Sequence, residues 1–379
     1  MYMIPRMLSI LYILMVCFTV QGVIIENRDG QKDLENGTHY KEYTCGSTVD
    51  DKIFFFVNPL YPDSLPNETL DCHLVISHDC SESTCQIRLD FEEFEISPPV
   101  HGDCSKDRFE IDSESPTPIL CGSNSKHHLY ADVQSRKKTQ LRFIIKPLAS
   151  PKLVIENNGV KSFKSEENSN KRFKILVTQI SCGCAKTFNE TSSLIKFNNP
   201  HLAPIGCTQY FKNLHTGYIK TFNYGGTIRN YDPCFNSSDP ICGERVPTGY
   251  LNNLDYSICI ELPKDHCGLT FTSSSFDVGI LPTGRRSIIE KQCEKDYIYI
   301  PQGMHPEDFK SSFPASRFCG PFLGIKELKS PIVTYSKPFV IHFHSDGFEE
   351  RFESTQVGFL IKFNSIPCYL SRFEVGSFV

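Results

Sequence analysis

Seventeen cysteines in a chain of 379 residues limit what this sequence can fold into more than any other feature. One of them, Cys17, lies in an N-terminal apolar segment, and the other 16 are an even number. Reduced cytosolic proteins rarely carry so many thiols, whereas extracellular domains pair them in disulfides. We therefore expect all 16 to be paired, in a protein of an oxidising compartment.

The N-terminal segment indicates how the chain reaches that compartment. An apolar run over residues 7–20 follows Arg6, and the Gln-Gly pair at residues 21–22 interrupts it. This pattern is typical of a secretory signal peptide, so we predict that residues 1–22 are removed. The alternative is an uncleaved anchor, because residues 23–25 almost extend the run to spanning length. No later stretch is long and apolar enough to cross a bilayer, so we expect a secreted, extracellular protein with no membrane span after signal cleavage.

Glycosylation sequons and net charge agree with this route. Four Asn-x-Ser/Thr sequons occur, and behind a signal peptide such sequons mark surface sites for glycosylation. The predicted glycosylation sites are Asn36, Asn67, Asn189 and Asn236. The formal net charge is −5. A mildly acidic surface is poorly suited to a phosphate backbone, so we expect no nucleic-acid partner.

Apolar residues alternate with polar ones in short segments through most of the chain. Segments of this kind, rich in β-branched and aromatic residues, are typical of strands with one buried face. They occur at residues 86–91, 141–145, 297–300, 339–343 and 358–363. No stretch sustains an amphipathic helical pattern, while 29 Phe and 16 Tyr supply bulk for a core. We therefore predict an all-β fold of the sandwich type.

One pattern of residues occurs twice. Each copy has a Cys-x-x-Asp motif before a strand-like segment and a Cys-Gly pair after it. The first copy contains Cys104, Asp107, Cys121 and Gly122, and the second contains Cys293, Asp296, Cys319 and Gly320. The same order of features indicates two copies of one module. The join between them falls near Cys182-Gly183-Cys184.

These residues resemble the CUB module, a two-sheet jelly-roll domain of extracellular proteins, over nearly the whole mature chain. The most specific part is Cys293-Glu-Lys-Asp-Tyr-Ile-Tyr-Ile, followed by Arg317-Phe-Cys-Gly. The segments 218–224 and 254–260 look most like the tandem pairs common in arthropod CUB proteins. The resemblance implies two jelly-roll β-sandwich modules in tandem. The first would cover residues 45–180, and the second, with insertions, residues 184–368.

The resemblance also implies part of the disulfide pattern. Cys45 with Cys72 looks like the first disulfide of the family, and Cys104 with Cys121 like the second. Cys293 and Cys319 would close the equivalent loop of the second module.

The remaining cysteines are additional to that pattern. We expect local pairs between neighbours in sequence, Cys80 with Cys85, Cys234 with Cys242, and Cys259 with Cys267. The sequence does not decide the pairing of Cys182, Cys184, Cys207 and Cys368. Our hypothesis pairs Cys207 with one of the first two and Cys368 with the other.

Many CUB modules hold Ca²⁺ through a Glu and two Asp at one end of the sandwich, since hard oxygen ligands suit that ion. By resemblance, the second module has Asp296 and Asp346 at two of these positions but Gly279 where the Glu belongs. The first module keeps Asp107, has Ser97 in the Glu position and lacks the other Asp. We therefore expect no resident cofactor or metal, with Asp296 and Asp346 as weak calcium candidates.

Motifs for other chemistry are missing. His342 and His344 share one face of a strand, and His127 and His128 are adjacent, but no third ligand with zinc spacing accompanies either pair. There is no Gly-x-Ser-x-Gly elbow, Gly-rich phosphate loop or His-Glu-x-x-His motif. A trypsin-like domain would need its own His, Asp and Ser blocks, and none fits after Cys368. We therefore predict no catalytic residues and no enzyme activity.

A rigid all-β scaffold with inserted loops is typical of a binding protein. Our leading hypothesis is a secreted, non-catalytic protein that recognises an extracellular protein or glycoprotein through loops of its CUB modules. Two alternatives belong to other classes, namely a truncated non-catalytic arm of a secreted serine protease and a component of the extracellular matrix. The fold alone does not name the ligand.

Overall fold

The structure is a computed structural model of the chain. It describes residues 39–78, 84–134, 136–147, 152–155, 161–164, 170–182, 201–228, 246–279, 288–289, 293–308, 314–325, 328–348 and 357–370. The predicted signal peptide and the sequons at Asn36, Asn189 and Asn236 lie outside these residues. No helix within the described ranges has the length and apolar character needed to cross a membrane.

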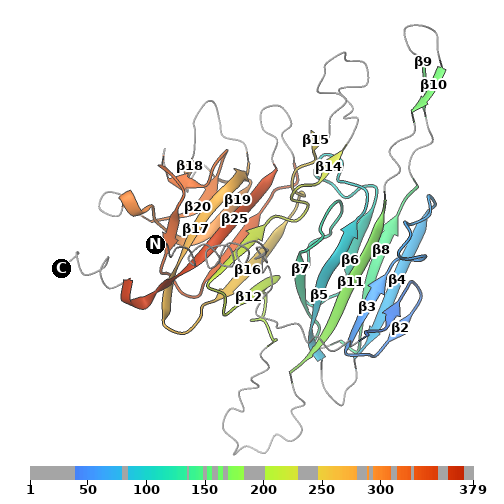
Figure 1. Cartoon of the computed structure of the whole chain (residues 1–379), viewed down its shortest axis with the longest axis horizontal. Coiled ribbons are helices and arrows are strands. Elements are labelled where there is room, and N and C mark those ends of the chain that lie inside the picture. Colours follow the sequence, from blue (N-terminus) through green and yellow to red (C-terminus); the bar gives the residue numbers. More distant parts are fainter. Residues whose placement is uncertain are drawn as a thin grey trace, which may run out of the picture. The chain divides into compact units, whose positions relative to one another are not determined.

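Strands from residues 42–181 form two sheets, which together we call the first sandwich. One sheet has the strand order β1-β3-β11-β5-β7 and the other β2-β4-β8-β6, drawn in blue to green in Figure 1. Their bounds are β1 Glu42–Tyr43, β2 Thr48–Val49, β3 Ile53–Val57, β4 Leu70–Ser77, β5 Thr84–Glu95, β6 Arg108–Ile111, β7 His128–Asp132, β8 Lys138–Ile145 and β11 Arg172–Ser181. A separate hairpin pairs β9 (Lys152–Ile155) with β10 (Lys161–Lys164).

Strands from residues 209–367 form two further sheets, the second sandwich. Their orders are β12-β16-β24-β19-β20-β18 and β13-β25-β17-β23, drawn mostly in yellow to red (Figure 1). Their bounds are β12 Gln209–Lys212, β13 Thr216–Lys220, β16 Asp255–Glu261, β17 His266–Asp277, β18 Ile288–Ile289, β19 Tyr297–Gly303, β20 Ala315–Cys319, β23 Ile332–Thr334, β24 Val340–His344 and β25 Gly358–Pro367. Small additions are the pairs β14 (Thr227–Ile228) with β15 (Val246–Pro247) and β21 (Gly324–Ile325) with β22 (Leu328–Lys329), and the 3₁₀ turn η4 (Pro306–Asp308).

The strand order of the first sandwich recurs in the second. The series β2-β4-β8-β6 corresponds to β12-β16-β24-β19, and each series begins with a parallel pair. The series β3-β11-β5-β7 corresponds in the same way to β13-β25-β17-β23. The long strands β5 and β17 both have 12 residues. In the pairing of β5 with β11, Cys85 and Glu92 of β5 have no opposite residue on the partner strand. In the pairing of β17 with β25, Cys267 and Ser274 are skipped in the same way, at the same positions along the long strand.

Phenylalanine builds the core of the first sandwich. Phe143 on β8 and Phe173 on β11 belong to different sheets, and their rings stack with centroids 3.8 Å apart. Exposed or half-buried positions alternate with buried ones along all of β8, as the two-residue period of a strand requires. Burying one such aromatic side chain stabilises the fold by about 1.5–3 kcal/mol. The predicted all-β sandwich fold is therefore confirmed.

Among the described residues, six disulfides are formed. Cys45–Cys72, Cys104–Cys121 and Cys293–Cys319 are the pairs that the resemblance implied. The others are Cys85–Cys182, Cys207–Cys259 and Cys267–Cys368. The predicted local pairs Cys80–Cys85 and Cys259–Cys267 are therefore wrong, and so is the pairing of Cys207 and Cys368 with Cys182 and Cys184. Cys80, Cys184, Cys234 and Cys242 lie outside the described residues.

Strand pairing explains these corrections. The antiparallel ladder joins the first residue of β5 to the last residue of β11, which brings Cys85 and Cys182 together. The start of β17 and the end of β25 do the same for Cys267 and Cys368. Cysteines that are close in sequence lose less loop-closure entropy when they pair. This entropy cost grows only slowly with loop length, so the advantage of a short loop is small. The pairing of the strands, rather than closeness in sequence, therefore determines which cysteines form disulfides.

The two sandwiches contact one another along a seam, where edge strand β7 meets edge strand β12. The backbone N–H of Tyr130 donates to the carbonyl of Thr208 at 2.8 Å. The backbone N–H of Tyr210 donates to Nε2 of His128 at 3.0 Å. A histidine ring thus takes the place of one backbone acceptor, and each edge is covered by the other strand.

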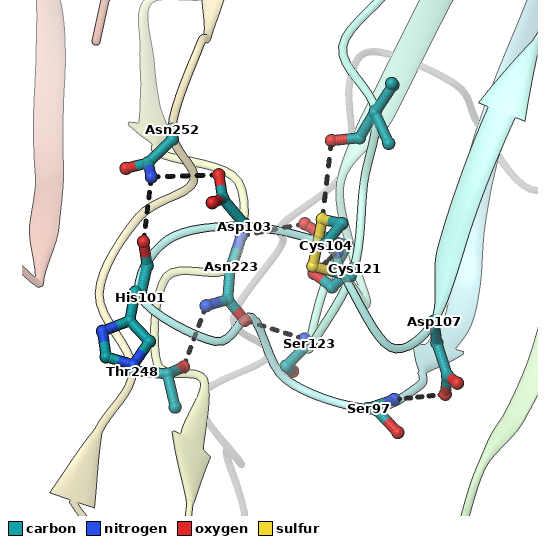
Figure 2. Close-up of a disulfide and its surroundings, with 12 residues drawn as sticks. Ser97, His101, Asp103, Cys104, Asp107, Cys121, Ser123, Asn223, Thr248 and Asn252 are labelled. Carbon is teal, nitrogen blue, oxygen red and sulfur yellow. Dashed lines mark hydrogen bonds between the residues drawn. A yellow bond between two sulfur atoms is a disulfide. The ribbon is translucent and has the colours of Figure 1, made fainter. Parts of the chain in front are cut away.

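Two asparagines of the second sandwich extend the seam to loops beside the Cys104–Cys121 disulfide (Figure 2). Asn223 accepts a hydrogen bond from the N–H of Ser123 through Oδ1 at 3.0 Å. Asn252 donates from Nδ2 to the carbonyl of His101 at 2.8 Å and to Oδ1 of Asp103 at 3.1 Å. Side chains that lie far along the chain thus satisfy polar groups of turns in the first sandwich.

Candidate functional site

A groove of about 750 Å³ lies on the outer face of the six-stranded sheet of the second sandwich. Ser257 and Cys259 of β16 and Val340 and His342 of β24 line it. Their neighbours along each strand point into the core, so these alternate residues point outward. Tyr210 on β12 lines the side nearest the seam.

Three connecting segments form the rim of the groove, at residues 204–207, 262–266 and 337–339. Ile205, in the first of them, is 84% exposed. The exposed charged side chains at the groove are Glu261, Lys264, Asp265 and Lys337. They carry both signs, so the groove does not select a strongly charged ligand by its field. An apolar floor with such a rim suits a protein segment that carries an apolar side chain.

The floor of the groove is braced from below. Cys207 is joined to Cys259 by a disulfide, and both belong to a small buried cluster with Tyr210. The same cluster contains Tyr130 and Ile180 of the first sandwich, so the groove and the seam share packing. A floor held in this way is formed before any partner arrives, which lowers the entropy cost of binding.

One polar interaction fixes the side of the groove. The Tyr210 hydroxyl donates to a carboxylate oxygen of Glu261. Burial raises the pKa of the Tyr210 phenol, and the Glu261 hydrogen bond raises it further. The hydroxyl therefore remains protonated and keeps donating at physiological pH.

The predicted calcium candidates of the second sandwich lie together and accept hydrogen bonds from the protein. Asp296 accepts a hydrogen bond from the Tyr250 hydroxyl at 2.6 Å and another from the N–H of Asp346 at 2.7 Å. Asp346 accepts from the N–H of Phe348 at 2.9 Å. Burial raises the pKa of the Asp296 carboxyl, and the Asp346 carboxylate raises it too. A resident divalent cation would instead require both groups as charged ligands.

The backbone at Gly279 disfavours any side chain, including the third carboxylate. Gly279 has φ of +66°, a left-handed conformation that side chains disfavour. A Cβ there would lie 3.1 Å from the carbonyl oxygen of Asp296. The N–H of Gly279 donates to the Tyr250 hydroxyl at 2.9 Å, so this hydroxyl connects Gly279 to Asp296. The residues of the second sandwich therefore do not fit a calcium site with a Glu at this position.

The first sandwich departs from the calcium pattern in another way. Asp107 is fully buried, and its Oδ2 accepts from the N–H of Ser97 at 2.8 Å (Figure 2). Its Oδ1 accepts from the N–H of Lys146 at 2.9 Å. The Nζ of Lys171 lies 3.0 Å from Oδ2. A protein cation therefore occupies the contact that a metal would need.

The histidines singled out by the sequence fall into two places. His342 and His344 lie on the outer face of β24, and His344 packs on Tyr297 with ring centroids 5.2 Å apart. His127 and His128 are buried at the seam. In the part of the chain that the structure describes, no group of three or more His, Cys, Asp or Glu side chains is arranged to hold a metal ion.

Comparison with known proteins shows what the second half of the chain is similar to. Residues 204–366 match the family model described as the animal CUB domain. This segment, which includes the groove lining, is therefore similar to animal CUB domains. A search of curated proteins found no match.

Several solved structures are similar to the chain. The CUB1-EGF-CUB2 domains of rat MASP-1 match with 16% identity and a TM-score of 0.27, covering 84% of this chain and 99% of that one. The MASP-1 CUB2 domain bound to Ca²⁺ matches with 15% identity and a TM-score of 0.25, covering 35% and 98%. The full extracellular region of zebrafish Gpr126/Adgrg6 matches with 9% identity and a TM-score of 0.27, covering 84% and 36%.

The groove is the part of the site that sequence reasoning missed. Its lining comes from β12, β16, β24 and three connections, and no motif links them. The only local signal is Ile205, an apolar residue set between Pro204 and Gly206 where a polar turn residue is expected. The predicted glycosylation site at Asn67 is exposed.

Proposed function

We propose that the chain is a secreted, non-catalytic binding protein whose two CUB modules, over residues 45–180 and 184–368, recognise an extracellular protein or glycoprotein. The groove on the second sandwich carries this proposal. It combines an apolar floor, a bracing disulfide and a largely exposed Ile205 at a rim built from loops. An apolar hollow of this kind on a stable sheet is typical of a docking surface.

Repetition supports the division into two modules, which we propose belong to the arthropod tandem type. Both sandwiches have the same strand series, and both skip residues at the same offsets of the long strand. Each has a disulfide from the start of that strand to the end of the last strand, with sequence separations of 97 and 101. Each also has a disulfide that starts at the Cys-x-x-Asp motif.

Disulfides support an extracellular location. Six of them in the described residues would be reduced in the cytosol, and the sequon at Asn67 is exposed as glycosylation requires. The signal peptide predicted over residues 1–22 supplies the route.

Affinity capture tests the function. We expect the tagged mature protein to capture a defined partner from extracellular fluid, identified by mass spectrometry. Ile205→Asp should weaken that complex about tenfold or more, because burying an isoleucine side chain stabilises by about 1.5–3 kcal/mol. Surface plasmon resonance with the purified partner measures the change. Treating the partner with glycosidases then distinguishes a protein epitope from a glycan.

A matched variant controls for exposure of the mutated side chain. Leu60 is 69% exposed on the first sandwich, away from the groove lining, so Leu60→Asp should leave the affinity unchanged. Equal binding by wild type and Ile205→Asp would show that the groove is not the binding site. Co-purification with a serine-protease domain would favour a non-catalytic arm of a secreted serine protease. Recovery only in a cross-linked insoluble fraction would favour a component of the extracellular matrix.

A further inference from the structure

Lys171 and Asp107 form an ion pair inside the first sandwich. Their side chains are 5% and 0% exposed, and the Lys171 Nζ lies 3.0 Å from Oδ2 of Asp107. Charged side chains are rarely so buried unless they are paired, because desolvation costs several kcal/mol for each ion. A lysine in this position therefore needs a specific explanation.

The contacts around the pair hold several chain segments together. The Nζ of Lys171 donates to the carbonyl of Lys146 at 2.8 Å, just beyond the end of β8. Asp107, just before β6, accepts from the backbone N–H groups of Lys146 and Ser97. The carbonyl of Lys171 accepts from the N–H of Leu65 at 2.7 Å. One cation and one carboxylate thus tie four separate parts of the chain to one another.

A bound calcium ion would make similar contacts with a carboxylate and a carbonyl oxygen. The ammonium group contacts both kinds of oxygen here, on Asp107 and Lys146. An ammonium needs far fewer oxygens than the six to eight, roughly, that calcium requires. The serine at position 97, where the resemblance places a glutamate, contributes its backbone N–H rather than a carboxylate oxygen.

We propose that the ammonium group of Lys171 is a built-in cation that stabilises this end of the first sandwich in place of a calcium ion. Because the cation is part of the chain, it does not dissociate when free calcium falls. The carboxylate of Asp107 is then unavailable to a metal or to a cationic side chain of a partner. The second sandwich satisfies its equivalent Asp296 with a neutral donor, the Tyr250 hydroxyl.

Charge replacement in the full mature chain tests the proposal. Lys171→Met keeps most of the side-chain volume and leaves Asp107 as an unpaired buried carboxylate, so the melting temperature should fall by on the order of 10 °C. Asp107→Asn combined with Lys171→Met removes both charges and should recover at least half of that loss. The melting temperature of the wild type should not move on adding EDTA or millimolar calcium chloride.

Lys174→Met, on β11 and three residues beyond Lys171, is the matched control. Lys174 forms a partly exposed pair with Glu42 at 3.1 Å, and its Nζ lies over the Phe55 ring. Its replacement should therefore lower the melting temperature by about 5 °C or less, clearly less than Lys171→Met. Equal effects of Lys171→Met and Lys174→Met would overturn the proposal. So would a double variant no more stable than Lys171→Met, or one that also fails to fold, since packing rather than charge would then explain the loss. Calcium binding by the wild type that Asp107→Asn abolishes would assign the site to a metal instead.

Discussion

Asparagine and glycine residues decide how closely the two sandwiches approach at the seam. A Cβ on Gly122 would lie 2.0 Å from Oδ1 of Asn223, and a Cβ on Gly102 would lie 2.2 Å from Oδ1 of Asn252. Both glycines also have positive φ, so two independent reasons exclude a larger residue. Each glycine of the first sandwich thus makes space for one asparagine of the second.

Replacing Asn223 tests this account. Its Nδ2 donates to the carbonyl of Gly249 at 2.6 Å, its Oδ1 accepts from Ser123, and its φ is +61°. Asn223→Ala should lower the free energy of unfolding by about 2–4 kcal/mol, through lost buried hydrogen bonds and a disfavoured backbone. Asn223→Gly loses the hydrogen bonds but tolerates the backbone, so it should cost less. Urea denaturation measures both.

Asn213 provides the control for backbone conformation. It also has positive φ, of +57°, but it is exposed. Asn213→Ala should therefore show mainly the backbone cost, about 1–2 kcal/mol. If Asn223→Ala were no more damaging than Asn213→Ala, the hydrogen bonds of Asn223 across the seam would contribute nothing to stability.

The long antiparallel pairs β5 with β11 and β17 with β25 are the elements that organise each sandwich. In both pairs the cysteine near the start of the long strand is skipped by the ladder, which turns its side chain out of the regular alternation. In both pairs this cysteine forms a disulfide with a cysteine just beyond the end of the partner strand, β11 or β25. These disulfides therefore fix the register of the two longest strand pairs.

Disulfide mapping tests these elements. Digestion without reduction should yield peptides that link Cys85 to Cys182 and Cys267 to Cys368. In the chain-entropy estimate, a loop of about 100 residues is worth roughly 4.7 kcal/mol and one of about 15 residues roughly 3 kcal/mol. Replacing Cys85 and Cys182 by alanine should therefore destabilise more than replacing Cys104 and Cys121. A peptide linking Cys80 to Cys85 would contradict the arrangement.

Local patterns predicted the strands well, and pairings between distant segments poorly. The alternating segments 86–91, 141–145, 297–300 and 358–363 all lie within strands, because alternation is a property of neighbouring residues. The pairing of Cys104 with Cys121 came from the family resemblance, not from this alternation. Which strands pair with one another determines the long-range disulfides, the groove and the Lys171–Asp107 pair. The residues next to them in sequence do not predict that pairing.

At the scale of the whole molecule, the seam depends on histidines that accept hydrogen bonds. Nε2 of His128 accepts from the backbone of Tyr210, which requires that this nitrogen carry no proton. His127 is fully buried next to the ring of Phe222, and its Nδ1 lies 3.3 Å from the side-chain nitrogen of Gln209. The sequence showed only two adjacent histidines, because their partners lie about 80 residues further on.

Stability should therefore decrease when the pH falls below about 6.5. Burial lowers the pKa of His127 well below 6.5, and the nearby Lys220 and His128 lower it further. Between the folded and unfolded pKa values the unfolded chain binds the additional proton, so the free energy of unfolding decreases as the pH falls below about 6.5. This histidine contributes at most about 1.4 kcal/mol per pH unit. Burial also lowers the pKa of His78, which adds a slope of the same sign.

Urea midpoints measured from about pH 7.5 to about pH 5.5 check this dependence. His127→Phe preserves the ring packing against Phe222 and removes the titrating group, so it should flatten the slope while leaving the part due to His78. The same replacement at the exposed His73 controls for the loss of a histidine ring at the surface. An unchanged slope in His127→Phe would show that the acid sensitivity arises away from the seam. A flattened slope would place a pH-dependent contact between the two sandwiches, next to the floor of the groove.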